Sequence, residues 1–259
     1  MPPLQPMLAK VRRPFRRNRS PGPSGCTNKW DGFRTLVFRD GDEVVLGSRG
    51  GKDLARYFPE LVRAVKDELP ERCVVDGELV VPRNIDGRTR LDWESLSERI
   101  HPAESRVTML AEKTPAQFVA FDLLALGDRD LSREDFSVRR AQLVDSVGGG
   151  SSCHVTAATE SSATATEWFE AFEGAGLDGV VAKKLVGPYL PNKREMVKVK
   201  HARTADCVVI GYRPHKSQPG IGSMLLGLYD GEQMAMVGGR RRSRPRGGSN
   251  CSPNSTNCA

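Results

Sequence analysis

The stretch Asn28–Phe38, NKWDGFRTLVF, places three charged side chains at the entrance of an apolar run. Lys29 precedes Asp31 by two residues and Arg34 by five, and the residues that follow are typical of a buried strand. A lysine amine becomes a useful nucleophile when burial or nearby cations lower its pKa. This stretch therefore makes Lys29 a candidate nucleophile.

Charged residues also adjoin other apolar runs. VVDGELVV carries Asp76 and Glu78, and LDGVVAKK carries Asp178 and Lys183. MVKVK carries Lys198 and Lys200, and the glycine-rich GSRGGKD carries Ser48, Arg49 and Lys52. Basic groups of this kind bind phosphates, and the acids can hold Mg²⁺. Taken singly, each has an ordinary structural interpretation. A DGE sequence is more often a turn, a K-x-K strand is usually a solvated face, and Phe121 is more often a core residue. The glycine-rich loop also lacks P-loop spacing.

Composition narrows the class of protein. The 259 residues are 38% hydrophobic and 27% charged, enough for one sizeable core, or for a main domain with a small one. No apolar run approaches the roughly 18 residues that span a membrane. The basic N-terminus lacks the apolar region of a secretory signal. The six cysteines form no C-x-x-C pair, so we expect reduced cytoplasmic thiols and no zinc site.

The net charge of +7 resides in the ends of the chain. Residues 1–28 carry +6 and residues 239–259 carry +5, which leaves −4 between them. Both ends are rich in Arg, Pro, Gly and Ser, and we expect them to be disordered. They are interpreted as nucleic-acid arms, as solvated tails, or as coding sequence read out of frame. The charge is therefore weak support for nucleic-acid binding by the folded part.

Between the ends, the pattern predicts a mixed fold. A hairpin turns at Asp40-Gly41, a helix begins near Pro59, and Asp92 caps a short helix. Further expected strands are 73–81, 117–126, GVVAKK, MVKVK and ADCVVIGYR, with a hairpin at Asp230-Gly231 and helices from Ser137 and around ATATEWFEAFEGAG. Strands outnumber helices and do not alternate strictly with them, which favours an antiparallel α+β fold.

The order of these motifs resembles one family. Lys29–Arg34 matches the K-x-D-G-x-R motif of the covalent nucleotidyltransferases, which comprise ATP-dependent DNA ligases, RNA ligases and mRNA capping enzymes. SRGG, DGE, FDLL, DGVVAK and VKVK resemble the later family motifs in the same order. The segment GPYLPNKREMVKVKHARTADCVVIGYR resembles the corresponding sequence of the short bacterial end-joining DNA ligases. The resemblance covers about residues 29–238 and implies a nucleotidyltransferase domain followed by an incomplete OB-fold β-barrel.

The resemblance also implies a chemistry. Lys29 attacks the α-phosphate of ATP, the AMP passes to a 5′-phosphate at a DNA nick, and a 3′-hydroxyl displaces it. Nucleotide-binding roles then fall to Asp31, Arg34, Arg49, Glu78, Phe121, Lys183, Lys198 and Lys200. Arg34 and Glu78 contact the ribose, Phe121 stacks on adenine, and Arg49 meets the nick phosphate. Mg²⁺ or Mn²⁺ is held by Glu78 and Asp178.

Departures from the family pattern affect where we expect the domains to begin and end. Thr27-Asn28 replaces the usual Glu-Pro, Asp178 stands where glutamate is frequent, and the last family motif is missing. We expect a basic, largely disordered segment 1–28, an adenylation domain 29–201, a partial OB-fold domain 202–239 with about three strands, and a disordered tail 240–259.

Two classes of function follow from this pattern. The first is an ATP-dependent DNA ligase for repair and recombination, with nicked or broken duplex DNA and ATP as partners. The resemblance adds a DNA-end-binding protein, no membrane, a monomer, and a cytoplasmic, nucleoid-associated location. The second is a catalytically inactive remnant that binds nucleotide or DNA. A capping enzyme or RNA ligase is a third interpretation within the same superfamily.

Overall fold

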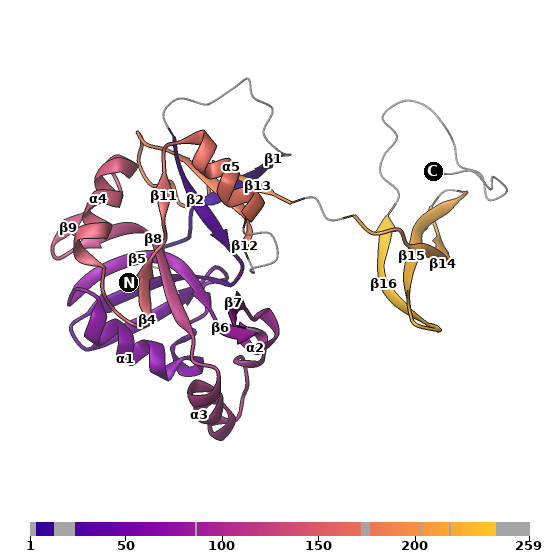
Figure 1. Ribbon diagram of the computed structural model, residues 1–259, viewed down its shortest axis with the longest axis horizontal. Coiled ribbons are helices and arrows are strands. Elements are labelled where there is room, and N and C mark those ends of the chain that lie inside the picture. The colour runs from indigo at the N-terminus through magenta and orange to yellow at the C-terminus, as the bar shows by residue number, and fades with distance from the viewer. Residues whose placement is uncertain are drawn as a thin grey trace. The chain divides into compact units, whose positions relative to one another are not determined.

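The chain divides into two units, Met1–His201 and Ala202–Ala259, which we call the larger and the smaller unit (Figure 1). The computed structural model describes residues 4–12, 24–85, 87–171, 177–201, 204–217 and 219–241. The division falls at the position of the expected domain boundary. Each unit is considered by itself.

The first sheet of the larger unit contains the strand that follows Lys29. Its strand order is β10 (Cys153–Val155), β8 (Gln117–Leu126), β5 (Arg72–Val80), β3 (Phe33–Asp40) and β4 (Glu43–Ser48), with β9 (Arg129–Asp130) paired to β8. All pairs are antiparallel except β10–β8. The predicted hairpin is confirmed: β3 and β4 turn through Gly41 at φ +61°, a conformation that glycine adopts without strain.

The second sheet carries Lys29 itself. Its order is β1 (Leu8–Arg12), β13 (Arg194–Lys200), β12 (Leu177–Lys184), β2 (Ser24–Trp30) and β11 (Ala158–Thr159). The β1–β13 pair is parallel and the others are antiparallel. The expectation of disorder over 1–28 is wrong for β1 and β2. Strand β2 is hydrogen-bonded on both edges and buries Cys26 and Thr27, which fixes it in the sheet. Residues 1–3 and 13–23 lie outside the described part.

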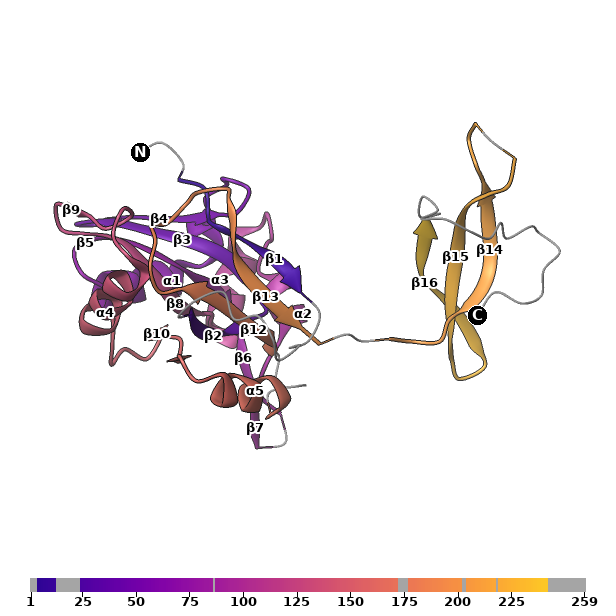
Figure 2. The ribbon, with the colours of Figure 1, turned by 90° about the horizontal axis from the view of Figure 1, so that it is seen from above.

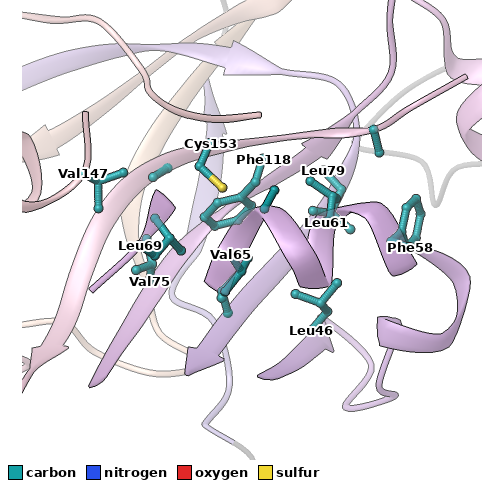
Figure 3. Close-up of a cluster of buried hydrophobic side chains, with 14 of the residues drawn as sticks. Leu46, Phe58, Leu61, Val65, Leu69, Val75, Leu79, Phe118, Val147 and Cys153 are labelled. Carbon is teal, nitrogen blue, oxygen red and sulfur yellow. The ribbon is translucent and has the colours of Figure 1, made fainter. Parts of the chain in front are cut away.

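Helices cover the first sheet and enclose its core. Helix α1 (Pro59–Glu68) has proline in its first turn, as predicted, and buries Leu61, Ala64 and Val65. Figure 3 shows Leu61 and Val65 directed at the apolar side chains of the sheet, among them Leu46 and Phe118. This packing anchors the strands that lead to the site.

The remaining helical elements are η1 (Ala55–Tyr57), α2 (Trp93–Glu98), α3 (Glu104–Lys113), α4 (Phe136–Ser146) and α5 (Ser162–Ala171). Asp92 caps α2 as predicted, because its side chain accepts a hydrogen bond from Ser95 N at 3.0 Å. Helix α3 and the hairpin β6 (Pro82–Ile85)–β7 (Arg88–Leu91) were not predicted. No described helix is long and apolar enough to cross a membrane.

The smaller unit is a three-stranded antiparallel sheet with the order β14 (Val208–Pro214), β15 (Ile221–Asp230) and β16 (Gln233–Arg241) (Figure 2). The predicted turn at Asp230-Gly231 is confirmed, with Gly231 at φ +61°. Strand β16 continues to Arg241, so the disorder expected from residue 240 is wrong for its first two residues, and 242–259 lie outside the described part. The assignment to an incomplete OB fold stays a prediction.

Close packing at Gly77 gives a stability test of the first sheet. A Cβ at Gly77 would lie 2.4 Å from the Phe118 ring and 2.6 Å from Val119 O, and a backbone oxygen cannot move aside cheaply. Gly77→Ala should lower the free energy of unfolding by about 1–3 kcal/mol in urea denaturation. Gly50→Ala is the matched control, because its Cβ meets nothing within 4 Å. Equal stability of the two variants would contradict this packing.

Candidate functional site

A cavity of about 390 Å³ in the larger unit is lined by strands of both sheets. It gathers residues that are far apart in the sequence. The predicted site residues in its wall are Lys29, Arg34, Arg49, Glu78, Phe121, Lys183, Lys198 and Lys200. Asp31 and Asp178 are not in the wall, but both lie beside Lys29. The structure thus brings together the ten residues to which the family resemblance assigns a role.

Strand periodicity explains why the lysines converge. Lys198 and Lys200 are two residues apart on β13, so they project from the same face of the sheet. In the register, Lys198 lies opposite Val181, and Val181 lies opposite Thr27 on β2. Lys29 is two residues beyond Thr27 and therefore shares that face. The register of three strands assembles the cationic wall.

Asp178 connects two of these lysines. Its Oδ2 lies 3.0 Å from Lys29 Nζ and accepts a hydrogen bond from Lys200 Nζ. Burial acts to raise the pKa of Asp178, but hydrogen bonds from Lys200 and Lys29 outweigh it and lower the pKa to about 2. Asp31 is a second, more distant carboxylate, 3.9 Å from Lys29 Nζ. The candidate nucleophile is therefore held by an ionised partner.

Arg34 is fixed on the opposite wall by a buried carboxylate. Its Nε and Nη2 donate to the two oxygens of Asp76, both at 2.6 Å, and Asp76 is fully buried. This bidentate geometry is the strong form of an arginine–carboxylate contact. The guanidinium also lies over the Phe121 ring, 4.4 Å from its centroid. Arg34 and Phe121 consequently form one rigid surface of the cavity.

Glu78 lies opposite Arg34 in the β3–β5 register and also faces the cavity. Burial raises the pKa of Glu78 to about 7, against the opposing attraction of Arg34 and Lys29. A carboxyl group that titrates near neutral pH in a cavity is a marker of functional sites.

Lys183 differs from the other lysines because its amine is bound to protein groups. It is 3% exposed, and its Nζ donates to Phe121 O at 3.2 Å and to Asp122 Oδ2 at 3.3 Å. Burial lowers the pKa of Lys183, and the Asp122 charge opposes this. Arg139 binds the same carboxylate at 2.8 Å. Lys183 thus supports the strand of Phe121, and its nucleotide-binding role stays a prediction.

Lys198 and Arg49 have no carboxylate within ion-pairing distance among the described residues. Burial lowers the pKa of Lys198, and the neighbouring charges of Lys200, Lys29 and Arg49 lower it further. A cluster of cations that repel one another and lack a carboxylate of their own is suited to an external anion such as a polyphosphate. Lys198 and Arg49 are therefore the wall residues whose charge is available to a bound anion.

Several wall residues were not predicted. Some of them come from the N-terminal segment or from the same strands as the basic residues: Met7, Trp30, Val181, Arg194 and Met196. Val181 and Met196 stand two residues before Lys183 and Lys198, so strand alternation would have identified them. Met7 has no comparable signal, because nothing local to its sequence indicates that it packs on the cavity.

The carboxylates suit a metal that is shared with a phosphate ligand. The described residues contain no group of three or more His, Cys, Asp or Glu side chains that could hold a metal ion by themselves. Mg²⁺ commonly binds through one or two carboxylates together with substrate phosphates. Glu78 in the wall and Asp178 beside it match that donor set.

Comparison with known proteins gives a consistent picture. A family model described as "ATP dependent DNA ligase domain" matches residues 6–200. DNA ligase C1 of Mycolicibacterium smegmatis is 63% identical over 242 residues, which cover 92% of this chain and 68% of the relative. DNA ligase C of Mycobacterium tuberculosis is 56% identical over 245 residues, covering 92% and 66%. The chain thus spans about two thirds of the length of these curated relatives.

A solved structure of mycobacterial DNA ligase D, complexed with ATP and MES, is also similar. It shares 28% identity at a TM-score of 0.56, over 92% of this chain and 72% of that one. The ligase domain of M. tuberculosis LigD gives 28% identity and a TM-score of 0.54. Both comparisons support the α+β architecture with mainly antiparallel sheets.

The raised pKa of Glu78 predicts a pH-dependent stability. An acid with a pKa of about 7 when folded, against a usual 4.5, favours the folded state at low pH, and this contribution is lost as pH rises from about 4.5 to 7. Glu78→Gln stays neutral, so its free energy of unfolding should rise relative to wild type over that range, by up to about 3 kcal/mol. Glu94→Gln on α2 controls for the loss of an exposed carboxylate. A constant difference across the range would contradict the raised pKa.

Proposed function

Because the chain belongs to the ATP-dependent DNA ligase family, we propose that it seals nicks in duplex DNA through a lysine–AMP intermediate at Lys29. The observation that carries this proposal is the composition of one cavity. It combines a lysine held by a carboxylate, two cations with no carboxylate partner in the described part of the chain, and an aromatic ring backed by arginine. Nucleophile, phosphate-binding groups and a base-stacking surface thus lie within reach of one nucleotide.

In the first step, Lys29 gives up its ammonium proton to solvent, and the freed amine attacks the α-phosphorus of ATP. A nitrogen–phosphorus bond forms, the bond to the pyrophosphate oxygen breaks, and the amine releases a proton to solvent. Asp178, 3.0 Å from Lys29 Nζ, orients the amine. Preorganised cations stabilise the charge that develops on the phosphoryl oxygens, which is the largest contribution available to such a site. Lys198, Lys200 and Arg49 supply them here.

The rest of the nucleotide would be held by the opposite wall. We assign adenine stacking to the Phe121 ring and the ribose contacts to Arg34 and Glu78, which lie opposite each other in the β3–β5 register. Glu78 accepts a hydroxyl hydrogen bond best when ionised, which its pKa of about 7 allows above neutral pH. Asp31 helps to place Lys29, which it approaches to 3.9 Å. These roles are proposals that rest on the position of each side chain in the cavity.

Glu78 and Asp178 are the residues that would hold Mg²⁺ or Mn²⁺, and the ion would neutralise phosphate charge. In the later steps, AMP is transferred to the 5′-phosphate of a nick, and the 3′-hydroxyl displaces it. Arg49 on the exposed rim is positioned to meet that phosphate. Cooperation with a DNA-end-binding protein, a monomeric state and a cytoplasmic, nucleoid-associated location stay predictions.

The alternative of an inactive remnant is not favoured, because similar relatives are named as DNA ligases and the cavity wall contains Lys29 together with Arg49, Lys198 and Lys200. A capping enzyme or RNA ligase is likewise less supported, since the relatives reported above are named as DNA ligases. Competition between nicked DNA and nicked RNA for the adenylated protein would separate these substrates.

The direct test is the intact mass of the protein after incubation with ATP and Mg²⁺. Wild type should gain one AMP, and Lys29→Ala should gain none, because the proposal assigns the attack on the α-phosphorus to Lys29 alone. Lys52→Ala is the matched control, since Lys52 is an exposed lysine of the nearby glycine-rich loop and should still be adenylated.

A pre-adenylated nick separates the steps of the reaction. Well-folded wild type that gains no AMP but seals this substrate would contradict the proposed first step and leave the later steps in place. Failure in both assays would contradict the proposed function.

A further inference from the structure

The Tyr189 hydroxyl is a buried polar group that the proposed mechanism does not use. Tyr189 lies between β12 and β13 and is 3% exposed. Its hydroxyl donates to Asp76 Oδ2 at 2.6 Å and accepts a hydrogen bond from Met7 N at 2.8 Å. Burial raises the pKa of Tyr189, so the hydroxyl keeps its proton at physiological pH and remains a donor.

These contacts close a ring around one corner of the cavity. The Oδ2 atom of Asp76 accepts hydrogen bonds from both Tyr189 and Arg34. Arg34 Nη2 also lies 3.5 Å from Met7 O. The next residue, Leu190, directs its N–H at Met7 Sδ at 3.5 Å. The ring joins segments that are far apart in the chain, and two of its members, Met7 and Arg34, line the cavity.

The members of the ring depend on one another because most of them are buried. Asp76 is 0%, Met7 5% and Tyr189 3% exposed, so water cannot replace a lost partner easily. A buried donor or acceptor that loses its partner is costly and rearranges to recover one. Without the hydroxyl, Asp76 loses one of its donors and the Met7 N–H loses its acceptor. Both wall residues would then be held less tightly.

We propose that Tyr189 is a positioning residue for ATP binding: its hydroxyl holds Arg34, through Asp76, and Met7, through its backbone N–H, in the cavity wall. This inference rests on the proposed function, because it assigns the cavity to the nucleotide. Tyr189 touches no reacting atom. It acts on the affinity of the preformed wall for ATP, and leaves Lys29 and Asp178 on the second sheet unchanged.

Tyr189→Phe removes the hydroxyl oxygen and keeps the aromatic side chain that fills the core. The measured quantity is the rate of lysine–AMP formation as a function of ATP concentration. KM for ATP should rise about tenfold, as expected for the loss of one hydrogen bond to a charged group, while the rate at saturating ATP stays within about twofold. Tyr57→Phe is the matched control, a partly buried tyrosine outside the cavity wall whose variant should leave both values unchanged.

The outcomes separate the two claims. Wild type that forms no adduct contradicts the proposed function. Wild type that forms the adduct, with an unchanged KM in Tyr189→Phe, overturns the positioning role alone. A fall in the saturating rate with an unchanged KM also overturns it, because that pattern indicates a general structural defect.

A measurement on wild type covers the case in which Tyr189→Phe does not fold. The amide of Met7 donates to Tyr189, so its hydrogen exchange should be slow, and bound ATP should slow it further by stabilising the preformed wall that Met7 lines. Exchange of Met7 that is fast, or that does not change with saturating ATP, would overturn the inference. The amide of Arg99, the C-cap residue of α2 and outside the cavity wall, controls for a global change in stability.

Discussion

Pairing of buried cations with carboxylates is the constraint on which this site depends. An unpaired charge in a protein interior costs several kcal/mol, so cations gather in a cavity only where acids compensate them. Three of the carboxylates that do this in the larger unit lie at or next to the site. Asp76 holds Arg34, Asp122 holds Arg139 and Lys183, and Asp178 holds Lys29 and Lys200. Because each acid sits on a central strand, the sheets fix the charges before any ligand arrives.

This arrangement divides the cations by task. Arg34, Lys183 and Lys29 are bound by protein carboxylates, which set their positions. Lys198 and Arg49 have no such partner among the described residues, which leaves their charge for an incoming phosphate. The same logic explains Glu78, whose burial raises its pKa to about 7, so that its charge state responds to small changes in its surroundings. Some cations of the wall are thus held in place by protein carboxylates, whereas Lys198 and Arg49 have no such partner among the described residues.

The sequence was informative wherever strand alternation or a local motif determines structure. The β3–β4 turn, the first turn of α1 and the Asp92 cap depend on neighbouring residues and were predicted correctly. Lys198 and Lys200 share a face because of strand periodicity alone. Features set by long-range pairing were missed. Strand β2 is ordered by β11 and β12, and Met7 reaches the cavity through Tyr189, 182 residues away. Nothing in the composition of 1–28 indicates those partners.

The central claim is that one cavity holds a nucleotide between Lys29 and the cations of β13. Lysine acetylation footprinting, read by mass spectrometry with a non-hydrolysable ATP analogue, tests it most directly. The account predicts that the analogue protects Lys29, Lys198 and Lys200, while Lys52 and Lys66 are acetylated equally with and without it. Protection spread evenly over all lysines, or absent from Lys198 and Lys200, would show that the nucleotide binds elsewhere and would contradict the account.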